Sequence, residues 1–198
     1  MKWSLPGNSW NPPQLQTARL TIRPLVPNDA EAIFAFCSDS RMTEYTLWET
    51  HQSIADTMQF LREYAPSRYR EQIPEPLGIV LRNDHSDSVI GTLGGFWISK
   101  SNGTMELGYA IAANFWGLGF ATEASQALID YLFTDYPIER LQARSMTPNR
   151  ASYRVLEKLG FRYEGTMRSL IYRRGRYWDV GIFGMLRADW ESSRRTRT

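Results

Sequence analysis

A strand pattern that passes through two glycines directly into a helix pattern is the feature that most constrains how this chain folds. It lies in residues 106–123, ELGYAIAANFWGLGFATE, where Gly117 and Gly119 separate the two patterns. Glycines at such a junction let backbone N–H groups line a concavity, and the N-terminus of the next helix adds partial positive charge. The segment predicts a strand–loop–helix unit suited to a phosphate or pyrophosphate. A tight turn that needs glycine for its geometry explains the same pattern.

The residues around these glycines exclude two common nucleotide-binding motifs. The chain contains no Gly-Lys pair, so the loop is not a Walker A loop. Thr122 stands where G-x-G-x-x-G requires its third glycine.

Hydrophobic periodicity predicts the other elements and a fold that is α+β or mixed α/β. In chain order we expect a strand at 19–25, helices that begin near Asp29 and Ser53, a proline-rich loop at 66–76, strands at 77–82, 89–99 and 104–112, a helix at 121–136, a strand at 141–146, a helix at 150–159 with Gly160 as a left-handed cap, and two final strands that flank a turn at Arg174 and Gly175.

Composition excludes several classes of protein. The 198 residues carry 23 basic and 21 acidic side chains, and a net charge of +2 gives no sign of a nucleic-acid partner. The cysteine Cys37 and the histidines His51 and His85 allow no internal disulfide and match no zinc spacing, so we expect no metal site.

The ends of the chain are predicted to flank a single domain at 19–187. Residues 1–18 are expected to be an irregular lead-in that lacks the apolar stretch of a signal peptide, which favours a cytoplasmic protein. The apolar run 107–121 is shorter than the roughly 20 residues that a membrane span needs, so no membrane partner is expected. Residues 188–198 are expected to be a tail that frays from Ser192.

Three segments of the chain, taken together, resemble a known family. They are TARLTIRPL (17–25), ELGYAIAANFWGLGFATEA (106–124) and NRASYRVLEKLGFRYEG (149–165). In this order and spacing they resemble the GNAT-type N-acetyltransferases and, within them, the RimJ/RimL-like branch. The resemblance implies a mixed, mostly antiparallel sheet with helices on both faces and a splayed parallel strand pair. It also implies acetyl-CoA as cosubstrate.

The resemblance assigns the cofactor-binding residues. The family's pyrophosphate loop falls on Trp116, Gly117, Leu118, Gly119, Phe120, Ala121 and the adjoining Thr122. Trp116 departs from the family's Arg or Gln at the first position. The strand residues Tyr109, Ala110 and Ile111 would lie along the cofactor, with the Ile111 N–H as an oxyanion donor. Asn149 matches the residue that binds the pantetheine arm.

The catalytic residues are less fully matched. Many relatives place a Tyr where this chain has Leu156, so the acid that protonates the leaving thiolate is assigned first to Ser152 and second to Tyr153. Direct attack by an amine needs a base, and Glu106 on a strand could accept the ammonium proton directly or through water. Alternatively, Glu106 is an exposed strand carboxylate and Ser152 a polar residue of its helix.

The acceptor cleft is predicted to be lined by Tyr45, Trp48, His51 and Trp97. Core packing of the aromatic rings and a structural role for His51 are the alternatives.

The sequence thus predicts an N-acetyltransferase that acts on a primary amine, preferably a protein N-terminal α-amine. The alternatives are an acetyltransferase for a small amine, such as an amino acid, polyamine or aminoglycoside, and a non-catalytic acyl-CoA sensor. A monomer or homodimer is expected.

Overall fold

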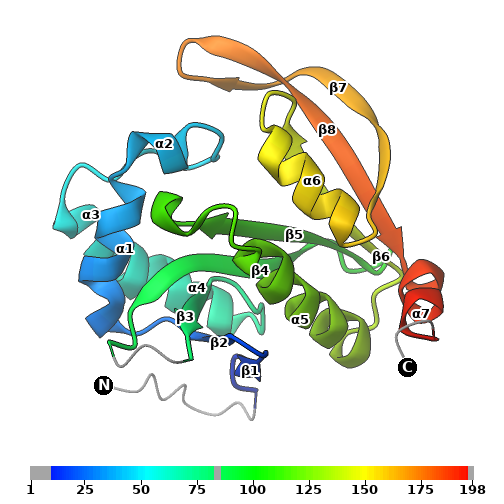
Figure 1. Cartoon of the computed structure of the whole chain (residues 1–198), viewed down its shortest axis with the longest axis horizontal. Helices are drawn as coiled ribbons and strands as arrows, with labels where there is room; N and C mark the ends of the chain where they lie inside the picture. The colour runs from blue at the N-terminus through cyan, green and yellow to red at the C-terminus, as the bar shows by residue number, and fades with distance from the viewer. Residues whose placement is uncertain (1–9, 83–85, 196–198) are drawn as a thin grey trace. The chain divides into compact units, whose positions relative to one another are not determined.

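A computed structural model describes residues 10–82 and 86–195 of the chain. Its strands form one eight-stranded sheet in the order β1-β2-β3-β4-β5-β6-β8-β7 (Figure 1). The pairs β1–β2, β2–β3, β3–β4, β6–β8 and β7–β8 are antiparallel, whereas β5 and β6 are parallel. The predicted mixed fold, a mostly antiparallel sheet with helices on its faces, is confirmed.

The elements follow the predicted order. The strands are β1 (Leu15–Gln16), β2 (Leu20–Pro24), β3 (Leu77–Leu81), β4 (Val89–Ser99), β5 (Thr104–Ile111), β6 (Arg140–Met146), β7 (Arg162–Arg173) and β8 (Arg176–Leu186). The α-helices are α1 (Ala30–Cys37), α2 (Ser40–Thr43), α3 (Ile54–Gln59), α4 (Ala65–Arg70), α5 (Phe120–Asp135), α6 (Arg150–Lys158) and α7 (Arg187–Arg195). Short helical turns lie at Pro27–Asp29, Phe60–Tyr64 and Ala113–Phe115.

The chain divides into two compact units. The first unit comprises Met1–Gly94 and Tyr109–Ala127, and the second comprises Gly95–Gly108 and Leu128–Thr198. The predicted single domain at 19–187 stays a prediction.

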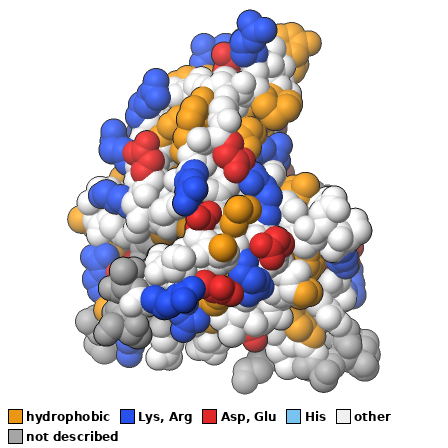
Figure 2. Space-filling view, turned by 90° about the vertical axis from the view of Figure 1, so that its right-hand side faces the viewer, with side chains coloured by type: hydrophobic (Ala, Val, Ile, Leu, Met, Phe, Trp, Pro, Cys, Tyr) orange, Lys and Arg blue, Asp and Glu red, His pale blue; other side chains and the backbone are white. Residues whose placement is uncertain are grey.

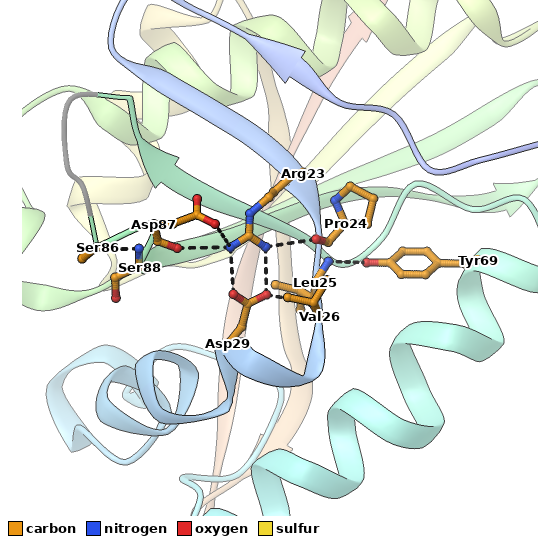
Figure 3. A network of polar contacts seen from close by, with 9 residues as sticks. All are labelled: Arg23, Pro24, Leu25, Val26, Asp29, Tyr69, Ser86, Asp87 and Ser88. Atoms are coloured by element: carbon orange, nitrogen blue, oxygen red, sulfur yellow. Dashed lines mark hydrogen bonds and ion pairs between the residues drawn. The ribbon is translucent and has the colours of Figure 1, made fainter. Parts of the chain in front are cut away.

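A buried ion pair holds the start of α1 in the first unit (Figure 3). Arg23 at the end of β2 donates to both carboxylate oxygens of Asp29, at 2.9 and 2.8 Å, and Asp29 is 5% exposed. The hydrogen bond from Arg23 to Asp29 raises the pKa of the guanidinium. Beside this pair, the Tyr69 hydroxyl accepts the Leu25 N–H at 3.1 Å, which fixes α4 against the chain that leaves β2.

A guanidinium caps the C-terminal end of α5 in the second unit. Arg187 donates to the carbonyl oxygens of Phe133, Tyr136 and Ile138 at 2.9, 3.2 and 2.9 Å. The last carbonyls of a helix lack intrahelical donors and carry partial negative charge, so a cation is stabilising there. Trp190 of α7 stacks on Phe133 with 5.2 Å between ring centroids. The predicted frayed tail is therefore wrong as far as Arg195, because α7 is anchored by this ring.

Two other predictions about the early chain are corrected. The expected loop at 66–76 begins with helix α4, which follows α3 and the π-helical turn Phe60–Tyr64 without a break. Pro66 therefore lies inside a continuous helical segment, next to the π turn, where the regular pattern of backbone hydrogen bonds is already interrupted. Within the expected irregular lead-in, the short strand β1 pairs with β2. The helix α2 was not predicted, and its four residues are too few for a periodic signal.

Charges of both signs share the face of the molecule drawn in Figure 2. Basic and acidic side chains are interspersed there, with hydrophobic side chains between them. The mixture matches the near balance of 23 basic and 21 acidic residues. Within residues 10–82 and 86–195, no helix combines the length and the apolar character needed to cross a membrane.

Candidate active site

The parallel strands β5 and β6 pair over a short stretch. Three residue pairs join them, and the last is Glu106 with Gln142. Strand β5 then runs on to Ile111. The pairing thus ends well before β5 does, as the splayed pair predicted from the resemblance requires. On the side of β4, the N–H of Ala112 donates to the Ile90 carbonyl at 2.9 Å, which keeps the end of β5 attached.

The glycine loop, residues 116–119, leads from β5 into α5 in the first unit. Gly117 and Gly119 have φ angles of 77° and 83°, a left-handed conformation that glycine adopts without a steric cost. The N–H of Glu123 donates to the Gly119 carbonyl at 3.0 Å, so this bond opens α5. The backbone N–H groups of Phe120, Ala121 and Thr122, which lie between these two residues, have no acceptor within the helix. They form, with the helix dipole, a site suited to an anion.

The Trp116 side chain directs its polar group into the protein's own backbone. Its indole Nε1 donates to the Ile111 carbonyl at 2.6 Å, although 53% of the residue is exposed. An Arg or Gln at this position would carry further side-chain donors, whereas the indole has this single donor. The donors that the loop offers to an anion are therefore backbone groups.

Arg19 and Glu123 form an ion pair beside the glycine loop. The sequence analysis assigned no role to Arg19. The Arg19 Nε lies 2.6 Å from a carboxylate oxygen of Glu123, and its Nη1 donates to the Leu118 carbonyl at 3.0 Å. The Thr17 hydroxyl donates to the other Glu123 oxygen at 2.6 Å. Burial opposes ionisation of Glu123, but the hydrogen bonds from Thr17 and Arg19 outweigh it and lower the pKa. The available signal was the position of Arg19 within the segment 17–25.

Glu106 is buried in the second unit, so its interpretation as an exposed strand carboxylate is wrong. It is 5% exposed. Its Oε2 accepts from Gln142 at 2.7 Å, and Arg144 Nε lies 2.9 and 2.8 Å from its Oε1 and Oε2. Each carboxylate oxygen has two lone-pair sites. Oε1, with one donor, retains capacity to accept another.

Asn149 and Ser152 form the N-terminal cap of α6. The Asn149 Oδ1 accepts the Ser152 N–H at 3.1 Å. This arrangement turns the amide nitrogen of Asn149 away from the helix, where it can donate to another group. Ser152 is half-buried in the first helical turn. Leu156, at the position where many relatives carry Tyr, is fully buried and belongs to the core.

Tyr153 packs against strand β8. Its ring meets Phe183 edge-on with 4.8 Å between centroids, and a side chain at Gly181 would collide with its hydroxyl. Burial, followed by the neighbouring Tyr163, raises the pKa of Tyr153, while Arg150 opposes the shift. The phenol therefore stays protonated at neutral pH, and its packing contacts account for its position.

Three of the predicted acceptor residues lie in one segment of the first unit. Tyr45 and Trp48 follow α2, and Trp48 is 37% exposed. His51 precedes α3, and its Nδ1 lies 2.7 Å from the Thr57 hydroxyl. Burial lowers the pKa of His51, with Asp56 opposing the shift.

Trp97, the fourth predicted acceptor residue, belongs to the second unit. It lies on β4, and its ring packs edge-on against Tyr136 with 6.0 Å between centroids. It is therefore part of a packed aromatic pair.

No cluster of three or more His, Cys, Asp or Glu side chains suited to a metal occurs in the parts of the chain that the structure describes, which leave out His85. Cys37 is buried, and burial raises the pKa of its thiol to about 12. The thiol is therefore neutral and inert at physiological pH.

Comparison with known proteins identifies the family. Residues 19–162 match the Acetyltransferase (GNAT) domain family. The chain belongs to this family of acetyltransferases. It is 34% identical over 179 residues to "Uncharacterized N-acetyltransferase p20" of Bacillus licheniformis, covering 89% of this chain and 97% of the relative. It is 29% identical over 177 residues to "Putative ribosomal N-acetyltransferase YdaF" of Bacillus subtilis, covering 88% and 95%.

A solved structure shows the same fold. The RimL ribosomal L7/L12 α-N-protein acetyltransferase, in complex with coenzyme A, superposes with a TM-score of 0.77 at 20% identity, covering 88% of this chain and 98% of that one. The chain is therefore a GNAT N-acetyltransferase with the fold of RimL, and the predicted recognition and enzyme class are confirmed.

Proposed function

We propose that this GNAT protein transfers the acetyl group of acetyl-CoA to a protein N-terminal α-amine. The observation that carries the proposal is the glycine loop, whose left-handed Gly117 and Gly119 lead into N–H groups at the start of α5 that have no acceptor within the helix. The acceptor class is supported by the name of the relative YdaF and by the activity named for RimL.

The residues of the chain fit acetyl-CoA at the loop. A pyrophosphate needs several convergent N–H donors, and Gly119, Phe120, Ala121 and Thr122 offer backbone donors at a helix N-terminus. We assign the pyrophosphate to residues 116–122. We assign the pantetheine arm to the edge of β5 at Tyr109, Ala110 and Ile111, and to the Asn149 amide nitrogen.

Acetyl-CoA, when bound, supplies an acetyl group activated as a thioester. The amine nitrogen attacks the carbonyl carbon, a C–N bond forms, the C–S bond breaks, and the thiolate takes up a proton. We assign the stabilisation of the carbonyl oxygen to the Ile111 N–H. Glu106, through Oε1 and a water, is assigned the ammonium proton. Ser152 is the first choice, and Tyr153 the second, for the proton delivered to the thiolate.

The acceptor is assigned to the segment of Tyr45, Trp48 and His51, and the resemblance to the family adds Trp97 as a further acceptor residue. The exposed indole of Trp48 offers apolar contact area to the side chains that follow an N-terminal amine. The ring of Trp97, already packed on Tyr136, is assigned a supporting position.

Thiol release from acetyl-CoA, measured against a panel of acceptors, tests the proposal. The panel contains N-terminal peptides, the same peptides with blocked α-amines, free amino acids, polyamines and aminoglycosides. Release with unblocked peptides and none with blocked peptides is the expected result. Release with small amines and none with peptides overturns the acceptor class. Acetyl-CoA binding with no release for any acceptor favours the sensor alternative.

A further inference from the structure

We infer that Thr17, Arg19 and Glu123 form a latch that fixes the glycine loop in its phosphate-binding conformation, so that Arg19 is a positioning residue for the cosubstrate. The inference rests on the proposed function, because it assigns a role within the same acetyl-CoA site. All three residues belong to the first unit.

The latch joins distant parts of the chain. Arg19 lies just before β2, and 104 residues separate it from Glu123 in the first turn of α5. Its Nε donates to a Glu123 oxygen at 2.6 Å, its backbone N–H donates to the other at 2.9 Å, and its guanidinium lies 4.5 Å from the centre of the Phe120 ring. Charge-assisted bonds of this length are among the stronger hydrogen bonds in proteins.

The same guanidinium sets the orientation of a peptide unit in the loop. Arg19 Nη1 donates to the Leu118 carbonyl at 3.0 Å. In a trans peptide the carbonyl and the following N–H point in opposite directions. Holding the Leu118 oxygen toward Arg19 therefore turns the Gly119 N–H to the opposite side of the loop, where it can donate to a phosphate.

The latch also balances charge at the helix N-terminus. The pKa of Glu123 is lowered by its hydrogen bonds from Thr17 and Arg19, so the carboxylate is ionised at neutral pH. A carboxylate in the first turn would compete with a pyrophosphate for the helix dipole and repel it. Arg19 compensates this negative charge and donates to both carboxylate oxygens of Glu123. The backbone N–H groups of the first helical turn are then left to the ligand.

The test compares two acetyl donors that differ in the pyrophosphate. Arg19→Ala and Glu123→Gln are assayed with acetyl-CoA and with S-acetylpantetheine, which carries the same thioester but no phosphate. We expect Arg19→Ala to raise the Kd of CoA and the KM for acetyl-CoA at least tenfold, and Glu123→Gln, which loosens the guanidinium but leaves it able to bond to the Leu118 carbonyl, to raise both by a smaller factor. Turnover with S-acetylpantetheine should be unchanged. Arg19→Lys, which keeps the ion pair with Glu123 but offers no second donor in the guanidinium geometry, should be intermediate.

Arg41→Ala is the matched control. The ion pair of Arg41 with Asp39 has the same 2.6 Å separation as that of Arg19 with Glu123, and its acid is similarly exposed, at 21% against 19%. This control should leave the Kd of CoA unchanged. Should Arg19→Ala fail to fold, Arg19→Lys, which keeps the charge but loses the guanidinium geometry at the Leu118 carbonyl, carries the comparison.

Two outcomes would overturn the latch. One is an equal loss of turnover with both donors, which would mark a general structural defect. The other is an unchanged Kd of CoA in Arg19→Ala and Glu123→Gln. Calorimetry of CoA binding by the unsubstituted protein separates the two proposals. Binding without turnover would contradict the proposed acetyl transfer, and the comparison of Kd values would still test the latch. The absence of binding would contradict both proposals.

Discussion

The glycine loop of the first unit and the start of α6 in the second unit present polar groups in opposite ways. Around the loop, side chains bond to one another or to carbonyls, and backbone N–H groups are what remains for a ligand. At the start of α6, the Ser152 N–H is already bonded to Asn149, and the side-chain amide nitrogen of Asn149 is what this cap offers to a ligand. A site of backbone donors tolerates a departure such as Trp116. A site of side chains depends on the identity of each one.

The largest effect is expected at Glu106. Glu106→Gln keeps the size of the side chain but cannot accept a proton as a carboxylate does. If Glu106 is the base, turnover should fall on the order of 10²-fold or more while the Kd of acetyl-CoA stays the same. Steady-state kinetics and calorimetry on one preparation measure both. Unchanged turnover would exclude Glu106 as the base and leave it with the structural bonds to Arg144 and Gln142.

Alanine at the loop glycines should have the next largest effect. Gly117 and Gly119 have φ angles of 77° and 83°, and an L-residue pays roughly 1–2 kcal/mol for this conformation. Each alanine variant should therefore raise the Kd of CoA about tenfold. A Cβ on Gly119 would lie at an ordinary van der Waals distance of 3.4 Å from Arg19 Nη2, and a Cβ on Gly117 has open space, so the backbone conformation is the cause of both effects and the two variants should behave alike. Wild-type affinity in both would show that the loop does not hold the cofactor.

Asn149 allows capping and ligand binding to be separated. Asn149→Ala removes the cap of α6 and should cost about 1 kcal/mol of folding free energy. Asn149→Asp retains a capping oxygen but lacks the amide donor, so its stability should match that of the unsubstituted protein. Both variants should bind CoA more weakly if the amide contacts the pantetheine arm. Normal binding by Asn149→Asp would limit Asn149 to its cap.

The smallest effect is expected from His51. Burial lowers its pKa below the ordinary 6.5, so the folded protein binds the proton less readily than the unfolded chain. Its contribution to stability is present above pH 6.5 and is lost as the pH falls toward the folded pKa. Urea unfolding measures the free energy of unfolding at pH 7.5 and at pH 5.5. The decrease in this free energy between the two pH values should be smaller in His51→Gln than in the unsubstituted protein. The same loss in both would remove His51 as a source of the pH dependence.

The sequence predicted elements whose signals are local. Gly160 ends α6 with a φ angle of 87°, and Arg174 and Gly175 form the turn between β7 and β8 with φ angles of 51° and 75°. The misses have physical reasons. Pro66 predicts the end of a helix, but in the structure it follows the π-helical turn Phe60–Tyr64 inside a continuous helical segment.

The site was predictable to the extent that it depends on neighbours in sequence. The glycine loop combines adjacent residues and was found from its pattern. The burial of Glu106 depends on Arg144 of the adjacent strand β6, and the register that pairs Glu106 with Gln142 has no local signal. The partnership of Arg19 with Glu123 spans 104 residues and follows only from the tertiary structure.

Trp116, at the first position of the glycine loop, gives this protein an intrinsic fluorescent group at the proposed cofactor site. An indole that is 53% exposed and bonded through its N–H to a backbone carbonyl fluoresces according to its solvent contact and that bond. Trp116 is one of seven tryptophans in the chain, so subtracting the emission of a Trp116→Phe variant isolates its signal. A stopped-flow instrument could then follow events at the loop in real time, without a label.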